Sequence, residues 1–364
     1  DFVKDVELFQ FADGTRTAAQ LFNQAPTDIQ WNATVPGGSL PGNGVLGILA
    51  TVDPDNTTPF TYSATSLPAG FTLNATTGAI TRTGGNLGTL QTYTFNLRTT
   101  DAGGKFFDET IRILTGNGGA NTLNGNNGDD IIYANGNSDT LNGLGGNDTL
   151  FGQSGNDTLD GGDGNDVLNG GSGTDTATYA SAASGVTVSL AITTQQNTGG
   201  SGLDTLASIE NLTGSALGDT LTGNADANTI DGGAGIDTLN GGAGGDILIG
   251  GAGADIIDTG AANDNVRDLI RLSVVADYGD TVSNFDANNT TSDDRVELGG
   301  ALATAFNDGG GASPFSINFA QGNNGGGTVN ANITAPSGFF GQNRTEALLL
   351  SGAGTEGVAN ADLT

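Results

Sequence analysis

The chain has 364 residues, including 63 glycines, 40 acidic residues and 10 basic residues, which give a formal net charge of −30. A polyanion of this kind does not bind nucleic acid or anionic lipid through charge. Cysteine and histidine are absent, which excludes disulfides, thiol catalysis, zinc sites built from these residues and Ser-His-Asp triads.

The sequence carries no targeting pattern. No run of about 18 apolar residues predicts a membrane span, and no basic segment followed by an apolar one predicts a classical signal peptide. Methionine is absent even from position 1. We therefore expect a processed product or a piece of a longer chain, with about two or three domains by length.

Residues 27–114 alternate apolar and polar side chains in short runs, such as Phe60 to Ser63 and Tyr93 to Leu97. Turns rich in Pro, Gly, Asn and Asp separate these runs. Short strands at regular spacing predict a β-sandwich, which we place at residues 25–114.

A nine-residue repeat fills residues 115–178. Its acidic or amide position recurs in strict register at Asn121, Asp130, Asp139, Asp148, Asp157, Asp166 and Asp175. Five residues before each lies a glycine, or Ala134 in one unit, and two residues after each lies an apolar residue. The unit at residues 161–169 reads GGDGNDVLN.

A second block of the same repeat fills residues 214–266. Its corresponding positions are Asp219, Asn228, Asp237, Asp246, Asp255 and Asp264. The separation of 44 between Asp175 and Asp219 is one short of five repeats, so the two blocks are out of phase. We interpret residues 179–213 as an insertion. Between Arg112 and Arg267 the sequence has 19 acidic residues and no basic one.

Residues 267–364 contain strand-like runs at 269–275 and 347–350, with glycine clusters at 309–311 and 325–327. They predict a closing segment and further β-structure. No part of the chain has a sustained apolar period of 3.6 residues, so the predicted fold class is all-β.

The repeat predicts a coil with metal sites at its corners. Six residues of each unit are typical of a turn, where glycine allows φ > 0, and three are typical of a strand. Two units make one coil turn of about 18 residues, so Asp139 and Asp157 become neighbours. Stacked carboxylates repel one another, whereas Ca²⁺ accepts six to eight oxygen ligands from carboxylates and carbonyls. Aspartates that only cap turns are the plainer alternative, which thirteen units in register without a basic partner disfavour.

This nonapeptide resembles the repeat of the RTX family of secreted bacterial proteins. The resemblance covers residues 116–178 and 214–266 and implies a parallel β-roll with several Ca²⁺ ions between successive turns. The ligands that it implies are turn carbonyls and the carboxylates of Asp130, Asp139, Asp148, Asp157, Asp166, Asp175, Asp219, Asp237, Asp246, Asp255 and Asp264. Weaker or missing sites are expected at Asn121 and Asn228, and where Leu144, Gln153, Leu217 and Ala262 replace glycine.

Other segments extend this resemblance. Residues 208–214 and 279–298 are similar to segments that open and close rolls in serralysin-type proteins. Residues 6–15 look like the end of a preceding roll, so we assign residues 1–24 to such a segment. Residues 25–114 resemble bacterial cadherin-like, Ig-like modules, although Gly42 stands where that family often has a calcium-ligating glutamate.

No catalytic constellation is present, so the sequence predicts no enzyme activity. Glu109, Glu210 and Glu297 are expected at the surface or at caps, and a glycosidase-like pair of carboxylates is disfavoured. The composition favours a calcium-binding structural protein of the Gram-negative cell surface (an S-layer subunit, extracellular filament or adhesin stalk) that passes a type I secretion channel and self-assembles on Ca²⁺. Cell-surface polysaccharide is a further candidate partner. The alternatives are the carrier region of a larger secreted enzyme and a ligand-binding adhesin.

Overall fold

The computed structural model describes most of the first 283 residues and short strands beyond them. The described residues are 8–11, 14–17, 23–33, 43–56, 58–83, 89–260, 266–272, 280–283, 295–298, 317–320, 327–334 and 345–352. All regular elements within these ranges are strands, which confirms the all-β prediction. None of these segments forms a helix long and apolar enough to cross a membrane.

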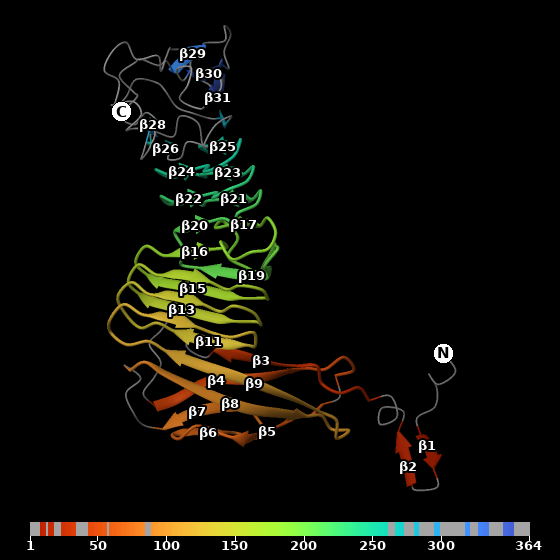
Figure 1. Cartoon of the computed structure of the whole chain (residues 1–364). Coiled ribbons are helices and arrows are strands. Elements are labelled where there is room, and N and C mark those ends of the chain that lie inside the picture. Colours follow the sequence, from red (N-terminus) through yellow and green to blue (C-terminus); the bar gives the residue numbers. More distant parts are fainter. Residues whose placement is uncertain are drawn as a thin grey trace.

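An antiparallel, sandwich-like module occupies the N-terminal part of the described chain (Figure 1). It follows a hairpin of β1 (Leu8–Phe11) and β2 (Gly14–Thr17). One sheet has the order β3-β4-β7-β6, and β5, β8 and β9 belong to the other. The bounds are β3 (Asp28–Ala33), β4 (Asn43–Val52), β5 (Thr61–Ser66), β6 (Phe71–Leu73), β7 (Ala79–Thr83), β8 (Gln91–Thr100) and β9 (Phe106–Thr115). Between the sheets, the ring of Phe71 packs edge-on against Phe95 at 5.1 Å, and Ile29, Ile80 and Ile111 are buried.

A parallel β-roll follows the module. Its first face is a nine-stranded parallel sheet. The strands in order are β10 (Thr122–Asn124), β12 (Thr140–Asn142), β14 (Thr158–Asp160), β16 (Thr176–Thr178), β20 (Asn211–Thr213), β22 (Thr229–Asp231), β24 (Ile247–Ile249), β26 (Leu269–Leu272) and β28 (Arg295–Leu298). Leu123, Leu141 and Leu159 pair in register 18 residues apart, as two nonapeptides per coil turn require.

The second face of the roll consists of two parallel runs of strands. The lower run contains β11 (Asp130–Tyr133), β13 (Thr149–Ser154), β15 (Val167–Ser172) and β19 (Gly202–Ala207). The upper run contains β17 (Thr187–Ser189), β21 (Thr220–Thr222), β23 (Thr238–Asn240), β25 (Ile256–Asp258) and β27 (Thr281–Ser283). Strand β31 (Thr345–Gly352) pairs with β27 and continues antiparallel into β30 (Gly327–Thr334) and β29 (Ile317–Ala320). Between the two faces, inward side chains from successive strands form a buried ladder, including Leu150, Leu168, Leu221 and Leu239.

The module and the roll share one sheet. Strand β9 of the module pairs in parallel with β11 of the roll, so β5, β8, β9, β11, β13, β15 and β19 are consecutive strands. Ile131, Tyr133 and Phe151 extend the apolar cluster of the module onto the outside of the roll. The rings of Tyr133 and Phe151 stack with their centroids 4.8 Å apart. The joint is therefore made of backbone hydrogen bonds and packed side chains.

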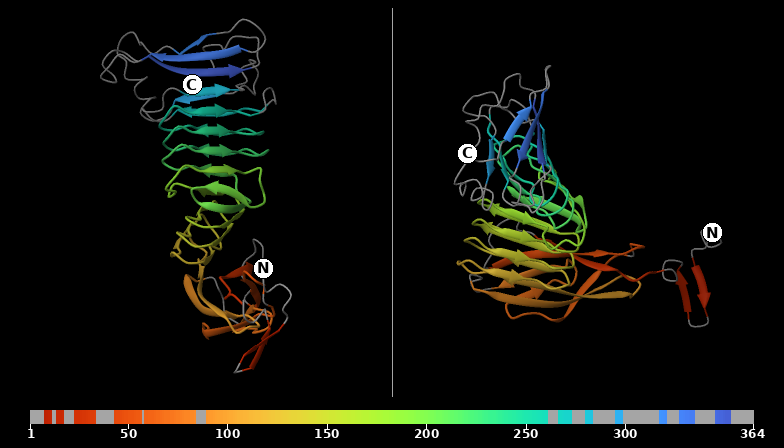
Figure 2. Two further views of the ribbon diagram at one scale, coloured as in Figure 1. Left: turned by 90° about the vertical axis from the view of Figure 1, so that its right-hand side faces the viewer. Right: turned by 45° about the horizontal axis from the view of Figure 1, so that its top comes forward.

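The insertion leaves the first face unbroken but adds strands to the second face. On the first face β16 pairs directly with β20. On the second face β19, β18 (Gln196–Gly199) and β17 lie between β15 and β21, where a regular coil has one strand. The amide of Gln196 spans the gap between β18 and β17, because its Oε1 accepts from the backbone N–H of Ser189 and its Nε2 donates to the carbonyl of Ser189. The lower and upper parts of the roll consequently face different directions (Figure 2).

We expect Leu159→Ala to lower the free energy of unfolding, because Leu159 is fully buried in the inner ladder. Losing such a side chain costs about 2–5 kcal/mol. Denaturant unfolding in saturating calcium measures the change. The matched control is Val167→Ala, since Val167 is 38% exposed on the outer face. Equal loss in both variants would contradict the proposed inner position of Leu159.

Candidate metal centre

The aspartates of the repeat form two ladders, one along each edge of the roll. The backbone N–H of one residue donates to the Oδ1 of the aspartate 18 residues later, as from Asp139 to Asp157 at 2.8 Å and from Asp148 to Asp166 at 2.8 Å. The same bond joins Asp237 to Asp255 at 2.9 Å. Each of these carboxylates is buried, and one of its two oxygens is thereby satisfied by the backbone.

The second carboxylate oxygen lacks a donor along most of both ladders. The Oδ2 atom is buried and accepts no hydrogen bond in Asp139, Asp148, Asp157, Asp166, Asp175, Asp237 and Asp255. The sequence places no Lys or Arg between Arg112 and Arg267. Burying a charge without a partner costs on the order of several kcal/mol, because the ion loses its hydration. The ladders therefore fit a bound cation.

In most units the residue that opens the turn is a glycine, which lies close to the orphaned oxygen. A Cβ atom on Gly143 would lie 2.2 Å from the Oδ2 of Asp148 and 2.4 Å from the carbonyl oxygen of Gly161. A Cβ atom on Gly232 would lie 2.4 Å from the Oδ2 of Asp237. A carboxylate oxygen and a carbonyl oxygen from successive turns thus lie close together beside Gly143. An all-oxygen donor set of this kind suits Ca²⁺.

At the second position of the unit, three residues other than glycine hold the left-handed conformation that most of these turns share. Asn135, Leu144 and Gln153 have φ values of 81°, 83° and 73° at the second position of their units. The Oδ2 atoms of Asp148 and Asp157 are still orphaned, so the replacement of glycine by Leu144 and Gln153 does not close these turns. The strain of a left-handed leucine is of order 1–3 kcal/mol.

The two asparagines of the ladders differ from the aspartates in charge and in bonding. The Nδ2 of Asn228 donates to the carbonyl of Glu210 at 2.8 Å, and the Nδ2 of Asn121 donates to the Oδ1 of Asn117 at 3.2 Å. The place of the orphaned oxygen is taken by the amide Oδ1 of Asn121 and of Asn228, which lies beside the leading glycine and accepts the N–H of the second residue of the turn.

Both ladders continue through the insertion. The Oδ1 of Asp204 accepts from the N–H of Asp166 at 3.0 Å, and the Oε2 of Glu210 accepts from the N–H of Asp175 at 2.8 Å. Asp268 and Asp280 extend the ladders beyond Asp246 and Asp255. None of these four was predicted as a site residue, because their separations of 38, 35, 22 and 25 residues break the repeat.

The predicted ligands are thus placed as follows. Asp139, Asp157, Asp175 and Asp246 lie along one edge of the roll, and Asp130, Asp148, Asp166, Asp219, Asp237 and Asp255 lie along the other. Asp264 falls outside the described residues. Glu210, which was expected at the surface or at a cap, is partly buried and occupies a ladder position.

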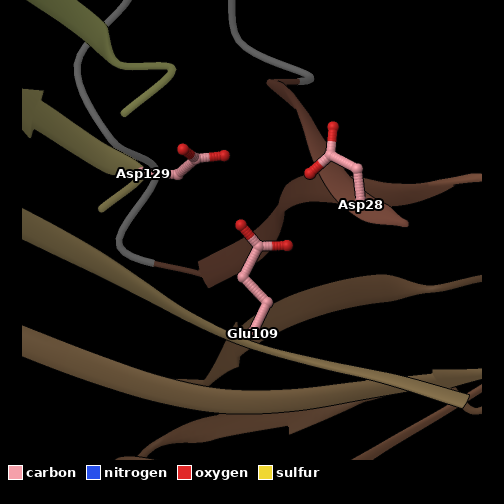
Figure 3. Close-up of side chains that lie close together, drawn as sticks. All are labelled: Asp28, Glu109 and Asp129. Atoms are coloured by element: carbon pink, nitrogen blue, oxygen red, sulfur yellow. The ribbon is translucent and has the colours of Figure 1, made fainter. Parts of the chain in front are cut away.

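A third group of carboxylates lies where the module meets the roll (Figure 3). Asp28 comes from β3, Glu109 from β9, and Asp129 from the turn before β11; one oxygen of each lies within 4.8 Å of the others. The Oε2 of Glu109 accepts from the N–H of Ile29 at 2.9 Å. Burial and the charge of Asp129 raise the pKa of Glu109. Three partly buried acids from distant segments could receive one cation, and no sequence spacing indicates the group.

Burial also raises the pKa of five ladder carboxylates. In the metal-free protein the pKa of Asp148 is raised to about 8 and that of Asp166 to about 7, chiefly by desolvation. Desolvation raises the pKa of Asp175, Asp237 and Asp255 to about 6. Without a cation the folded roll therefore binds protons at these acids more tightly than an exposed aspartate does.

The repeat region matches the family model of the RTX calcium-binding nonapeptide repeat in four copies, at residues 115–150, 142–177, 213–248 and 231–266. Residues 32–116 match the family described as "Putative Ig domain". Among solved structures, the solution structure of a subunit of the mannuronan C5-epimerase of Azotobacter vinelandii is 24% identical, covers 41% of this chain and 78% of that chain, and has a TM-score of 0.28. No curated protein matches the chain.

Gly143→Ala should weaken calcium binding, because its Cβ atom would clash with the Oδ2 of Asp148 and the carbonyl of Gly161. Calorimetric titration with CaCl₂ measures the number and affinity of the ions. The matched control is Gly118→Ala, since a Cβ atom there meets no atom within 4 Å. The same binding curve for wild type and Gly143→Ala would show that no ion lies at this turn.

The stability of the calcium-free protein should fall as the pH rises from about 5 to about 8. Asp148 and Asp166 have folded pKa values above the unfolded value of 3.8. Their protonated forms therefore stabilise the fold below that value, and this stability is lost as the pH passes the folded pKa. Calcium binds the ionised acids, so its affinity should rise over the same range. Melting followed by circular dichroism at both pH values, with and without calcium, tests both trends. Apo stability that increases with pH would contradict the assignment.

Proposed function

Because the chain carries RTX calcium-binding nonapeptide repeats and an Ig-like domain, we propose that it is a calcium-dependent structural protein of a bacterial cell surface. The repeats point to a secreted bacterial protein. The proposed role is that of a stiff unit in a surface layer, filament or adhesin stalk, without a catalytic step. The predicted resemblances to RTX repeats and to Ig-like modules are both confirmed by the family matches.

One observation carries the calcium dependence, namely the row of buried carboxylate oxygens that accept no hydrogen bond. A bound Ca²⁺ would supply the missing positive charge to these oxygens and to the turn carbonyls. The nonapeptide strands are only three residues long at many positions, and each buries one side chain in the inner ladder, as β12, β14 and β23 do. The apolar contribution is therefore small, and metal binding free energy becomes folding free energy.

The joint between module and roll favours a structural role. The sheet that begins at β5 runs through β9 into β11 and onward to β19. Modules joined by flexible linkers reorient freely, whereas this module is held by a parallel pair of strands and by the packed rings of Tyr133 and Phe151. The arrangement is that of a rigid spacer.

Charge supports assembly that depends on calcium. The net charge of −30 keeps copies of the chain apart. Calcium at the roll would lower this repulsion when the chain meets millimolar calcium outside the cell, where extracellular modules bind at about 10⁻⁴–10⁻³ M. We propose type I secretion of the extended, calcium-free chain from a Gram-negative cell, followed by folding and self-association, with surface polysaccharide as a second partner.

The purified chain should form ordered sheets or filaments in about 10 mM CaCl₂, a concentration above millimolar sites, and should stay monomeric in EDTA. Sedimentation velocity and electron microscopy distinguish these states. The double variant Asp157→Asn/Asp166→Asn should assemble poorly. The matched control is Asp163→Asn/Asp226→Asn, which changes the charge equally at exposed turn positions.

A chain that folds with calcium but stays monomeric would contradict self-assembly and favour the carrier region of a secreted enzyme or a ligand-binding adhesin. A chain whose circular dichroism and sedimentation do not respond to calcium would contradict the calcium dependence itself.

A further inference from the structure

Four turns of the roll differ from the rest. In these turns the N–H of the second residue of the nonapeptide donates to the acid or amide of its own unit. The bonds run from Asn117 to Asn121 (2.7 Å), from Asn126 to Asp130 (2.7 Å), from Ser215 to Asp219 (2.6 Å) and from Asn224 to Asn228 (2.8 Å). We call them self-capped turns, because the turn itself supplies a donor to the side chain that elsewhere has an orphaned oxygen.

The side chain of the second residue explains the different conformation. In Asn117, Asn126 and Asn224 the Oδ1 atom accepts from the backbone N–H two residues later, and in Ser215 the Oγ atom does so. This local bond holds an ordinary turn. The four residues are not among those with positive φ, whereas Gly162, Gly171, Gly233 and Gly251 at the same position are left-handed.

The aspartates of the self-capped turns have donors or a cation of the protein itself beside them. The Oδ2 of Asp130 accepts from the N–H of Asn126, whereas its Oδ1 accepts no hydrogen bond and is paired only by charge with the Nε of Arg112 at 3.6 Å. The Oδ1 of Asp219 accepts from the N–H of Val186 at 2.7 Å and from the hydroxyl of Ser215 at 2.9 Å. The positive ends of these donors lie beside the oxygens that a cation would need.

Asp204, in the insertion, is satisfied in another way. Its Oδ1 accepts from the N–H of Asp166. Its Oδ2 accepts from the hydroxyl of Thr198 at 2.9 Å and from that of Tyr179 at 3.3 Å. All of these groups are buried. A buried carboxylate with three protein donors has no orphaned oxygen left to offer.

We propose that calcium occupies two separate arrays, one from Asp139 to Asp175 and one from Asp237 to Asp255. No calcium then lies at Asp130, Asp204 or Asp219, because groups of the protein itself stabilise their carboxylates. The conformation at the second residue of each nonapeptide separates the two kinds of turn. This inference rests on the proposed calcium binding and adds which aspartates take part in it.

The two arrays are separated by a metal-free segment of the roll. This segment comprises the insertion and the self-capped turns of Ser215 and Asn224, which lie directly above it in the coil. Each array therefore begins above a self-capped turn. At the other end, Arg112 of the module supplies a fixed cation to the first aspartate of its edge. The roll therefore begins at the module, and continues above the insertion, with turns that need no metal.

Asp219→Asn and Asp237→Asn test the proposal as a matched pair. Both residues lie on the same edge, and in both variants the Oδ1 atom can still accept the ladder N–H, from Val186 and from Asp219 respectively. Asp219→Asn should bind as many calcium ions as the wild type with unchanged affinity. Asp237→Asn should bind fewer. Equilibrium dialysis against ⁴⁵Ca²⁺ counts the ions, and circular dichroism in calcium checks that both variants fold.

Asp204→Asn and Asp255→Asn repeat the comparison at two other rungs, so a variant that fails to fold does not remove the test. An equal loss of ions in Asp219→Asn and Asp237→Asn, or in Asp204→Asn and Asp255→Asn, would overturn the proposal. A wild-type chain that binds no calcium would instead refute the proposed function, a result that the wild-type measurement alone identifies.

Discussion

The buried carboxylate oxygen without a donor is the constraint on which the rest of the roll depends. Each stacked aspartate fixes the turn below it through one oxygen and leaves the other beside a glycine carbonyl. The sequence has no basic residue between Arg112 and Arg267 to balance these charges. A thin ladder of inward leucines and isoleucines cannot outweigh a row of unpaired buried ions. The same residues therefore shape the coil and make it require a cation.

The exceptions to this rule lie at the places where the coil begins. At the module the first acid meets Arg112, and above the insertion Asp219 meets Ser215. The first turn of a stack needs an acid that is stabilised without a turn below it. The chain provides such an acid at the module and again above the insertion. The insertion serves the same need, because the hydroxyls of Thr198 and Tyr179 donate hydrogen bonds to Asp204.

The sequence was sufficient to predict the parallel coil, its 18-residue turn and the inward ladder, because a strict nine-residue spacing is compatible with few other folds. It was not sufficient to predict the structure where the nine-residue spacing is interrupted. Asp204 and Glu210 reach the ladders through an irregular loop, and Gln196 bridges strands by a side-chain amide. Residue type alone also does not fix the turn. Asn126 and Asn135 occupy the same position with opposite conformations, since Asn135 donates to the carbonyl of Gly116 one coil turn earlier and Asn126 begins its edge.

The Gln196 bridge has a mechanical consequence. The strand ladders of the roll run along its axis, so an axial pull on the two ends acts on all rungs in series. Elsewhere adjacent strands are joined by several backbone hydrogen bonds, but between β18 and β17 the connection on the second face consists of the Gln196 amide and one bridge between Val186 and Gly199. The weakest connection in a series sets the force at which the series opens. Under tension the roll would yield first on that face, hinging about the unbroken pair of β16 and β20.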